Sequence, residues 1–125
     1  MRCARLAAVG LALLLTFTAA MPAFAGYGAF ALDTNAHKFG YSANQPDQQH
    51  ADQLALKNCK STNCKVAFPV GPRLCGALAT SEKRDSTAWG GAAKPTKEAA
   101  ALAAINDCQK HTSGQCKVRA SGCNR

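Results

Sequence analysis

The chain has 125 residues, a formal net charge of +8 and seven cysteines. A chain of this length holds one small domain, so a multidomain organisation is excluded. After the N-terminal segment, no stretch approaches the roughly 20 apolar residues that a membrane-spanning helix needs, so a protein with helical spans is excluded as well.

Residues 1–25 predict a secretory signal peptide. Two arginines precede an apolar run over 6–18, and Ala23-Phe24-Ala25 follows as a small-x-small cleavage signal. Cleavage after this signal removes the arginines and Cys3, which leaves six cysteines and a net charge of +6 on residues 26–125. We therefore expect a secreted or periplasmic protein that has no transmembrane span after cleavage.

Residues 27–70 predict two strands, a helix and a third strand. Around a turn at Thr34-Asn35, large apolar residues alternate with smaller ones, which is the period of a hairpin with one buried face. These large residues are Phe30, Leu32, Phe39 and Tyr41. A helical pattern follows Pro46, in which Ala51, Leu54, Ala55 and Asn58 recur at i, i+3, i+4 and i+7 and the apolar ones form one stripe. In the last strand, Val66 and Phe68 are expected to point to one face.

Residues 74–123 repeat this order of elements. The matched pairs are Gly28-Ala29 with Gly76-Ala77, Gly40-Tyr41 with Trp89-Gly90, and Pro46 with Pro95. Each predicted helix ends in a cysteine and leads to a Cys-Lys-Val strand. We expect Trp89 to be a core residue of the second hairpin and Thr96 to cap the second helix. That helix should turn Ala101, Leu102 and Ile105 inward.

Several such coincidences in the same order indicate an internal duplication. We therefore predict an α+β fold of two β-β-α-β repeats, at about 27–70 and 74–123, within a single domain at 26–125. The helices are expected to pack on one face of an antiparallel or mixed sheet. We expect the domain to be a monomer.

The cysteine spacing distinguishes a disulfide framework from a metal site. Zinc sites favour tight C-x2-C pairs, whereas the cysteines after each predicted helix are spaced C-x4-C and C-x7-C. The duplication predicts the pairs Cys59–Cys64 and Cys108–Cys116, each joining a helix end to the next strand. Cys75 and Cys123 are then left to pair with each other. We expect no metal and no other cofactor.

No arrangement of residues predicts a reaction. The histidines, His37, His50 and His111, share no motif with a serine or an unpaired cysteine, and the carboxylates are scattered along the chain. The glycine-containing segments Gly-Tyr-Gly and Trp-Gly-Gly are typical of hairpins and do not form a phosphate-binding motif. We therefore predict no catalytic residues, and an enzyme is the less favoured interpretation.

Basic residues recur beside the cysteines of both predicted repeats. They are Lys57, Lys60, Lys65, Lys110, Lys117 and Arg119. The candidate contacts for an anionic partner are Lys60, Lys65, Lys110 and Lys117, although a solvated basic surface without such a partner gives the same pattern. No nucleic-acid partner is expected, because export separates the protein from nucleic acid and no aromatic platform accompanies the lysines.

These motifs resemble the bacterial domain-of-unknown-function family 4189. The resemblance covers residues 27–123 and rests on a Gly-Ala-x-Ala strand, a second glycine-containing strand, an alanine-rich helix that ends in cysteine, and Cys-x-Val. It departs from the family in having Tyr41 where tryptophan is frequent. The resemblance implies a secreted or periplasmic bacterial protein without an assigned enzymatic activity, and it carries over no catalytic residues.

The sequence is compatible with two functions. The favoured one is a secreted non-enzymatic binding protein of the effector, inhibitor or envelope-associated type, whose partner is an unknown protein or an anionic envelope component. The alternative is a small secreted hydrolase that assembles a site from scattered Asp, Glu and His residues. A cleft with convergent carboxylates or a carboxylate–histidine pair would favour the hydrolase, and a basic face would favour the binding protein.

Overall fold

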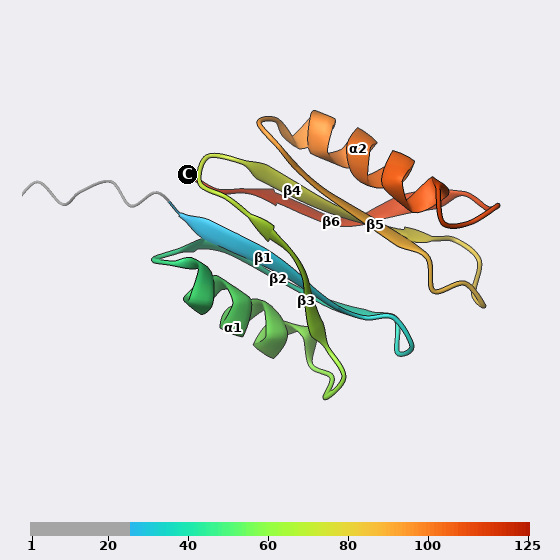
Figure 1. The fold of residues 1–125 in the computed structure, drawn as a ribbon, viewed down its shortest axis with the longest axis horizontal. Helices are drawn as coiled ribbons and strands as arrows, with labels where there is room; N and C mark the ends of the chain where they lie inside the picture. The colour runs from blue at the N-terminus through green and yellow to red at the C-terminus, as the bar shows by residue number, and fades with distance from the viewer. Residues whose placement is uncertain (1–25) are drawn as a thin grey trace, which may run out of the picture.

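The computed structural model describes residues 26–125, and the predicted signal peptide at 1–25 lies outside the described residues. Each half of the described chain forms two strands, a helix and a third strand (Figure 1). The first half contains β1 (Tyr27–Asp33), β2 (Lys38–Gln45), α1 (Gln48–Cys59) and β3 (Lys65–Val70). The second contains β4 (Cys75–Ser81), β5 (Trp89–Lys94), α2 (Lys97–Gln109) and β6 (Cys116–Cys123). The predicted α+β fold of two β-β-α-β repeats is confirmed.

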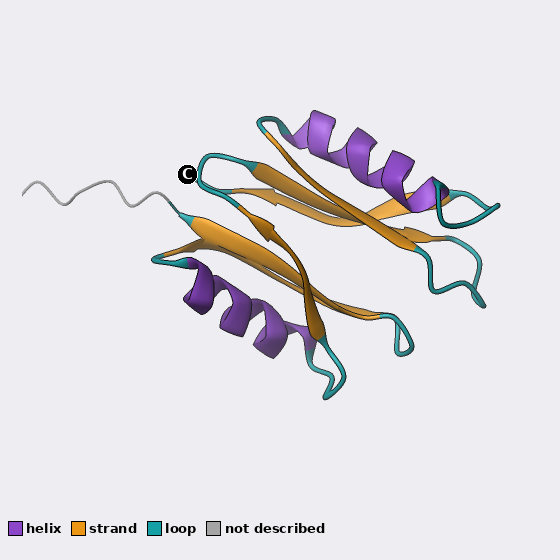
Figure 2. Ribbon diagram, viewed as in Figure 1, coloured by secondary structure: helices purple, strands orange, loops and turns teal. Residues whose placement is uncertain are grey.

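Each repeat forms its own three-stranded antiparallel sheet, with the order β2-β1-β3 in the first and β5-β4-β6 in the second. The first strand of each repeat is therefore central, and the helix crosses one face of the sheet between the two edge strands. The sheets pack face to face with α1 and α2 on the outer sides (Figures 1 and 2). The expectation that both helices pack on one face of one sheet is therefore wrong: each repeat has its own sheet, and periodicity does not specify which strands pair.

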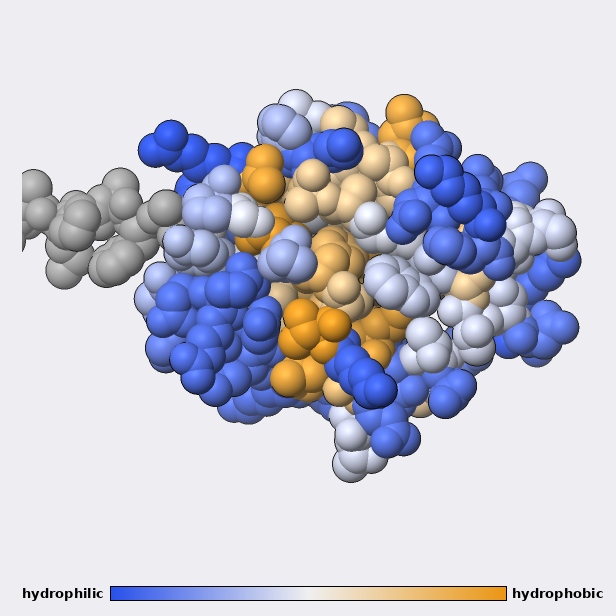
Figure 3. Space-filling view, viewed as in Figure 1, coloured by the Kyte–Doolittle hydropathy of each residue, from blue (hydrophilic) through white to orange (hydrophobic). Residues whose placement is uncertain are grey.

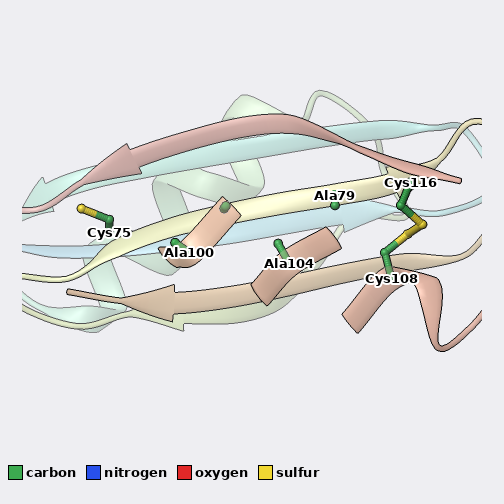
Figure 4. Packing of buried hydrophobic residues seen from close by; sticks show 7 residues of the cluster. Cys75, Ala79, Ala100, Ala104, Cys108 and Cys116 are labelled. Carbon is green, nitrogen blue, oxygen red and sulfur yellow. A yellow bond between two sulfur atoms is a disulfide. The ribbon is translucent and has the colours of Figure 1, made fainter. Parts of the chain in front are cut away.

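Each helix begins at a side-chain cap and lies close to its sheet. Asp47 and Thr96 each accept a hydrogen bond from the backbone N–H three residues on, at 2.8 and 3.2 Å. The buried helix residues are Ala51, Ala55 and Cys59 in α1, and Ala100, Ala104 and Cys108 in α2 (Figure 4). A Cβ added at Gly40 or Gly90 would overlap helix backbone atoms, so the strand beneath each helix requires glycine there.

The predicted helix faces are correct for the small residues of α1 and wrong for Leu102 of α2. Asn58 is exposed, and its side-chain amide donates a hydrogen bond to the carbonyl of Tyr41 at 2.8 Å. Leu102 is 63% exposed on α2, whereas Ala101 and Ile105 are partly buried beside the core. The close approach of each helix leaves room only for a row of small side chains at i, i+4 and i+8, and this row excludes Leu102.

Strand register corrects one predicted match between the hairpins. Gly40 and Gly90 are equivalent, because each pairs with a buried alanine of the central strand and each lies against helix backbone. Trp89 is therefore equivalent to Phe39. The predicted match of Gly40 with Trp89 is wrong by one residue, since the hairpin loops of the two repeats differ in length.

The last strand of each repeat contains a β-bulge, which the sequence did not predict. The register of β3 shifts between the residues that pair with Phe30 and Ala31, which leaves Ala67 as the extra residue. The register of β6 shifts at the equivalent place, where Arg119 is the extra residue. Phe68 consequently packs in the core between the sheets, whereas Val66 lies on the other side of its sheet and is 37% exposed.

The core between the sheets is asymmetric. Its aromatic rings come mainly from the first sheet, where the ring centroid of Phe30 lies 4.7 Å from that of Tyr41 and 4.9 Å from that of Phe68. A Cβ added at Gly91 of the second sheet would overlap the Phe68 ring, and one at Gly122 would overlap the Tyr41 ring. Large side chains of the first repeat therefore fill the space that glycines of the second repeat leave open.

The described chain contains three disulfides, which join Cys59 to Cys64, Cys108 to Cys116 and Cys75 to Cys123, as predicted. The first two close the turn between each helix and the following strand, and the third joins directly opposite residues of β4 and β6. Three disulfides indicate a protein that folds in an oxidising compartment. No helix among residues 26–125 is long and apolar enough to cross a membrane.

Candidate functional site

The connecting loops gather at two ends of the molecule. One end, which we call the loop end, carries the segments 34–37, 60–64, 82–88 and 110–115 (Figure 1). The segments 46–47, 71–74 and 95–96 lie at the opposite end, together with the termini of the described chain. Because both repeats run in the same direction, their equivalent loops come together at the loop end.

The loop end carries most of the positive charge. Its basic residues, all exposed, are Lys38, Lys57, Lys60, Lys65, Lys83, Arg84, Lys110, Lys117 and Arg119. Its carboxylates are Asp33, Glu82, Asp85 and Asp107. The charges at the opposite end nearly balance, with Arg73, Lys94, Lys97 and Arg125 against Asp47, Asp52 and Glu98. The ion pairs within residues 26–125 both involve histidine, so no lysine or arginine there is neutralised by a carboxylate contact.

The predicted contact lysines lie at the loop end in two separate pairs. Lys60 and Lys110 are the C-cap residues of α1 and α2, and Lys65 and Lys117 lie at the start of the strands that follow. The two pairs flank equivalent disulfides at different corners of the loop end (Figure 1). A cation at a helix C-terminus also interacts favourably with the helix dipole, so the two cap lysines have a structural role of their own.

Trp89 lies at the mouth of the core between the sheets. Its ring stacks on that of Phe68, with a centroid distance of 6.3 Å and an angle of 9° between the planes. The side chain is only half-buried, and it lines three hollows at the loop end. The expectation that Trp89 is a core residue is therefore correct only for the side that contacts Phe68.

A large open hollow of about 670 Å³ lies beside β3, and we call it the β3 groove. It is lined by Thr34-Asn35 of the hairpin turn, by Thr62-Asn63 of the first disulfide loop, and by Leu32, Val66 and Trp89. Lys65 also lines it. Figure 3 shows apolar side chains gathered in the middle of the face on which β3 and β5 lie, with hydrophilic side chains around them. The β3 groove thus combines an apolar surface with hydroxyl, amide and ammonium groups.

Asp33 connects the two loops that border the β3 groove. Its Oδ1 accepts hydrogen bonds from the backbone N–H groups of Asn35 and Ala36 at 3.1 and 3.2 Å, and its Oδ2 accepts one from the Ser61 hydroxyl at 2.5 Å. The Ser61 hydrogen bond, followed by that from Ala36, lowers the pKa of Asp33 below its ordinary value. Asp33 is only 4% exposed. It therefore positions the two loops and does not present a free acid or base.

A smaller pocket of about 90 Å³ lies beside Trp89. Phe39 and His37 line it, together with Arg119. The Arg119 Nε donates a hydrogen bond to the Thr80 hydroxyl at 2.8 Å, which fixes the direction of the guanidinium. The β-bulge of β6 thus places a cation at the loop end that has no counterpart in β3, where Ala67 is the bulge residue.

The two histidine–carboxylate pairs lie at helix ends and are exposed to solvent. His50 Nδ1 lies 2.8 Å from Asp47 Oδ1, and His111 Nε2 lies 3.7 Å from Asp107 Oδ1. The hydrogen bond from the backbone N–H of His50, followed by that from its ring, lowers the pKa of Asp47. Asp107 also accepts a hydrogen bond from the N–H of Gly91 at 3.2 Å. Among the described residues neither histidine is hydrogen-bonded to a hydroxyl, so these pairs support capping and strand positioning better than hydrolysis.

The sequence did not indicate the β3 groove. Its hydrogen-bonding residues come from two loops of the first repeat, and its aromatic ring comes from the second repeat. Only the packing of β3 beside β5 brings them together. The one local signal was the dipeptide Thr-Asn, which occurs at 34–35 and again at 62–63.

Comparison with known proteins gives one match. A family model described as "Domain of unknown function (DUF4189)" matches residues 27–123. No curated protein and no solved structure matches the chain. The family resemblance drawn from the sequence motifs is confirmed over the same residues.

Proposed function

Because the chain belongs to the family of the domain of unknown function DUF4189, which assigns no activity, we propose its function from the geometry. The protein is a secreted, non-enzymatic binding protein of the envelope-associated type, and its loop end contacts an anionic component of the cell envelope. The observation that carries this proposal is the concentration of unpaired cations at one end of a disulfide-bonded domain.

The distribution of charge supports binding better than it supports solubility alone. A net charge that only kept the protein soluble would not need to gather at one end, and the opposite end is nearly neutral. Clustered charges of one sign raise the local concentration of ligands of the opposite sign and increase the association rate. The disulfides Cys59–Cys64 and Cys108–Cys116 hold the two basic corners in place, so little conformational freedom is lost on binding.

Export is part of the proposal. The three disulfides indicate an oxidising compartment, and secretion or periplasmic residence follows if the segment 1–25 is removed after Ala25. An intact-mass measurement on protein recovered from the medium or periplasm should give a chain that begins at Gly26. A mass that retains Met1 would contradict this part of the proposal.

A matched pair of charge variants tests the binding surface. The loop-end variant replaces Lys60, Lys65, Lys110 and Lys117 with Glu. The control variant replaces Arg73, Lys94, Lys97 and Arg125 with Glu, so the net charge changes equally at the opposite end. Retention of residues 26–125 is measured on phosphatidylglycerol vesicles, on neutral phosphatidylcholine vesicles and on immobilised polygalacturonate.

We expect the unmodified protein to bind at least one of the two anionic surfaces and not the neutral one. Binding should weaken as salt is added, because the screening length is about 8 Å at physiological ionic strength. The loop-end variant should bind at least tenfold more weakly, since each basic residue near an anionic surface contributes about 1 kcal/mol. The control variant should change binding by less than about threefold, because its substitutions lie at the end away from the anionic surface, where the attraction is screened. An equal loss in both variants, or no retention on either anionic surface, contradicts the proposal.

A further inference from the structure

We propose that the β3 groove binds a hexopyranose unit of an acidic polysaccharide. This inference rests on the proposed function and identifies the ligand class for one part of the loop end. It is carried by the presence, in a single groove, of a fixed aromatic ring, two sets of free hydroxyl and amide side chains, and an unpaired lysine.

The polar lining matches the hydroxyl groups of a sugar. Thr34 and Asn35 line the groove from the hairpin turn, and Thr62 and Asn63 line it from the disulfide loop. Within residues 26–125, the side chains of these four residues make no hydrogen bond. Asn35 and Asn63 donate hydrogen bonds to other side chains, but only through their backbone N–H groups. A hydroxyl or an amide both donates and accepts, which suits a polyol that presents the same two functions.

The two polar loops are held in fixed positions before any ligand binds. The Asp33 carboxylate bonds to the hairpin turn through Asn35 and Ala36 and to the disulfide loop through Ser61. The disulfide Cys59–Cys64 closes the second loop. A preformed site loses less conformational entropy on binding, so several weak hydrogen bonds suffice for a useful affinity.

Trp89 supplies a flat apolar surface on which a sugar ring can stack. One face of a pyranose ring carries mainly C–H groups, which pack well against a flat aromatic ring. Stacking on Phe68 fixes the indole of Trp89 while leaving part of it exposed to the groove. A large, rigid side chain with few rotatable bonds gives contact area at a low cost in entropy.

The charge of the groove favours an acidic sugar. Lys65 is exposed, lines the groove and has no carboxylate partner among the described residues. Asp33 also lines the groove, but its carboxylate is nearly buried and accepts three hydrogen bonds. The exposed charge of the groove is therefore positive, and a sugar carboxylate can pair with the Lys65 ammonium.

The second repeat shows that the fold does not require this groove. Both repeats form the same helix–strand corner with a disulfide across it. Ser81 ends β4 where Asp33 ends β1, and its hydroxyl accepts the N–H of Lys83. Gln115 precedes Cys116 where Asn63 precedes Cys64, and its backbone carbonyl bonds to the N–H of Glu82. The polar residues around the β3 groove are thus not needed to build the corner.

Trp89 is the only tryptophan in the chain, so its fluorescence reports directly on the groove. Residues 26–125 are titrated separately with trimers of galacturonate, glucuronate and mannuronate, and with a galactose trimer as the neutral counterpart. Asn63→Ala and Lys65→Ala test the groove. Gln115→Ala, at the position of the second repeat equivalent to Asn63, and Lys94→Ala, an exposed lysine at the opposite end, are the matched controls. All four positions are exposed, so folding should be unaffected, and circular dichroism checks this.

We expect a saturable fluorescence change with at least one uronate trimer and at least fivefold weaker binding of the galactose trimer. Asn63→Ala and Lys65→Ala should each weaken binding about tenfold, which is the effect of losing one hydrogen bond to a charged ligand. The control variants should change binding less than twofold. No response to any uronate, equal binding of galactose, or equal losses in the control variants overturns the proposal. If the trimers fail while the anionic surfaces still retain the protein, the groove is wrong and the proposed function stands.

Discussion

At the scale of single residues, glycines decide how closely the layers of this protein approach one another. Gly40 and Gly90 let the helices lie directly on their strands, and Gly91 and Gly122 receive aromatic rings from the opposite sheet. Because a Cβ at any of them would overlap an existing atom, the space they leave is part of the packing. The sequence identified Gly90 and Gly91 as hairpin residues but did not show what lies against any of the four glycines.

Gly91→Ala should destabilise the protein by forcing the Phe68 ring out of its position. Overpacking of this kind costs roughly 1–3 kcal/mol of unfolding free energy, measured by urea denaturation. Gly71→Ala is the control, because an added Cβ there meets only Leu74 Cδ1 at 3.5 Å. That variant should change stability by no more than about 0.5 kcal/mol. Equal effects in the two variants would contradict the packing of Phe68 against Gly91.

Asp33 should make stability depend on pH in the acid range. The hydrogen bond from Ser61 lowers the pKa of Asp33 in the folded state, so its stabilisation is present above the ordinary pKa of the carboxyl group. That stabilisation is lost as the pH falls through the lowered folded-state value. In Asp33→Asn and in Ser61→Ala, the unfolding free energy should therefore decline less steeply between about pH 5 and pH 2. Variants with the slope of the unmodified protein would show that the Ser61–Asp33 contact does not form.

At the scale of elements, each helix packs through a single row of small residues. The row in α2 is Ala100, Ala104 and Cys108, which sit over the central strand of the sheet (Figure 4). The sequence placed Leu102 on this face, because a leucine in an alanine-rich helix is normally its inward anchor. Gly90 lets the helix lie so close to the strand that a leucine would not fit between them, so Leu102 points outward.

Substitutions on α2 can distinguish the two placements of Leu102. Leu102→Gln should alter the unfolding free energy by no more than about 0.5 kcal/mol, since the side chain is 63% exposed. Ala104→Leu should cost about 1–3 kcal/mol, because it inserts a large side chain into a filled site. Thermal or urea denaturation measures both. A large loss in Leu102→Gln with a small one in Ala104→Leu would restore the placement expected from the sequence.

At the scale of the whole molecule, the duplication explains what the sequence could and could not predict. The element order, the Thr96 cap and the disulfides Cys59–Cys64 and Cys108–Cys116 follow from local patterns, and the pairing of Cys75 with Cys123 follows by elimination. The face-to-face sheets and the β3 groove depend on contacts between unlike repeats, such as Phe68 with Trp89. Asn124 is a further example: its side chain donates to the carbonyl of Val70 at 2.8 Å and accepts from the N–H of Asn44 at 2.9 Å. No local pattern shows such contacts, because the partners lie far apart in the chain.

The disulfide Cys75–Cys123 should contribute most to global stability, because it closes the longest loop. Its sequence separation is 48, against 8 for Cys108–Cys116. In the chain-entropy estimate these loops correspond to about 4 and about 2.5 kcal/mol. Replacing both cysteines of each pair with alanine and measuring urea denaturation should give losses in that order. A larger loss from the Cys108–Cys116 pair would show that the short bridges, and not the long one, dominate stability.

A residue-by-residue map of contacts by NMR tests directly whether the loop end is the binding surface. Labelled protein spanning residues 26–125 is titrated with short polygalacturonate fragments and its backbone amide shifts are followed. We expect shifts confined to the loop end, at 34–37, 60–65, 82–89 and 110–119. Shifts centred on the opposite end, at 46–47, 71–74 and 95–96, or spread along the outer faces of α1 and α2, would contradict this expectation.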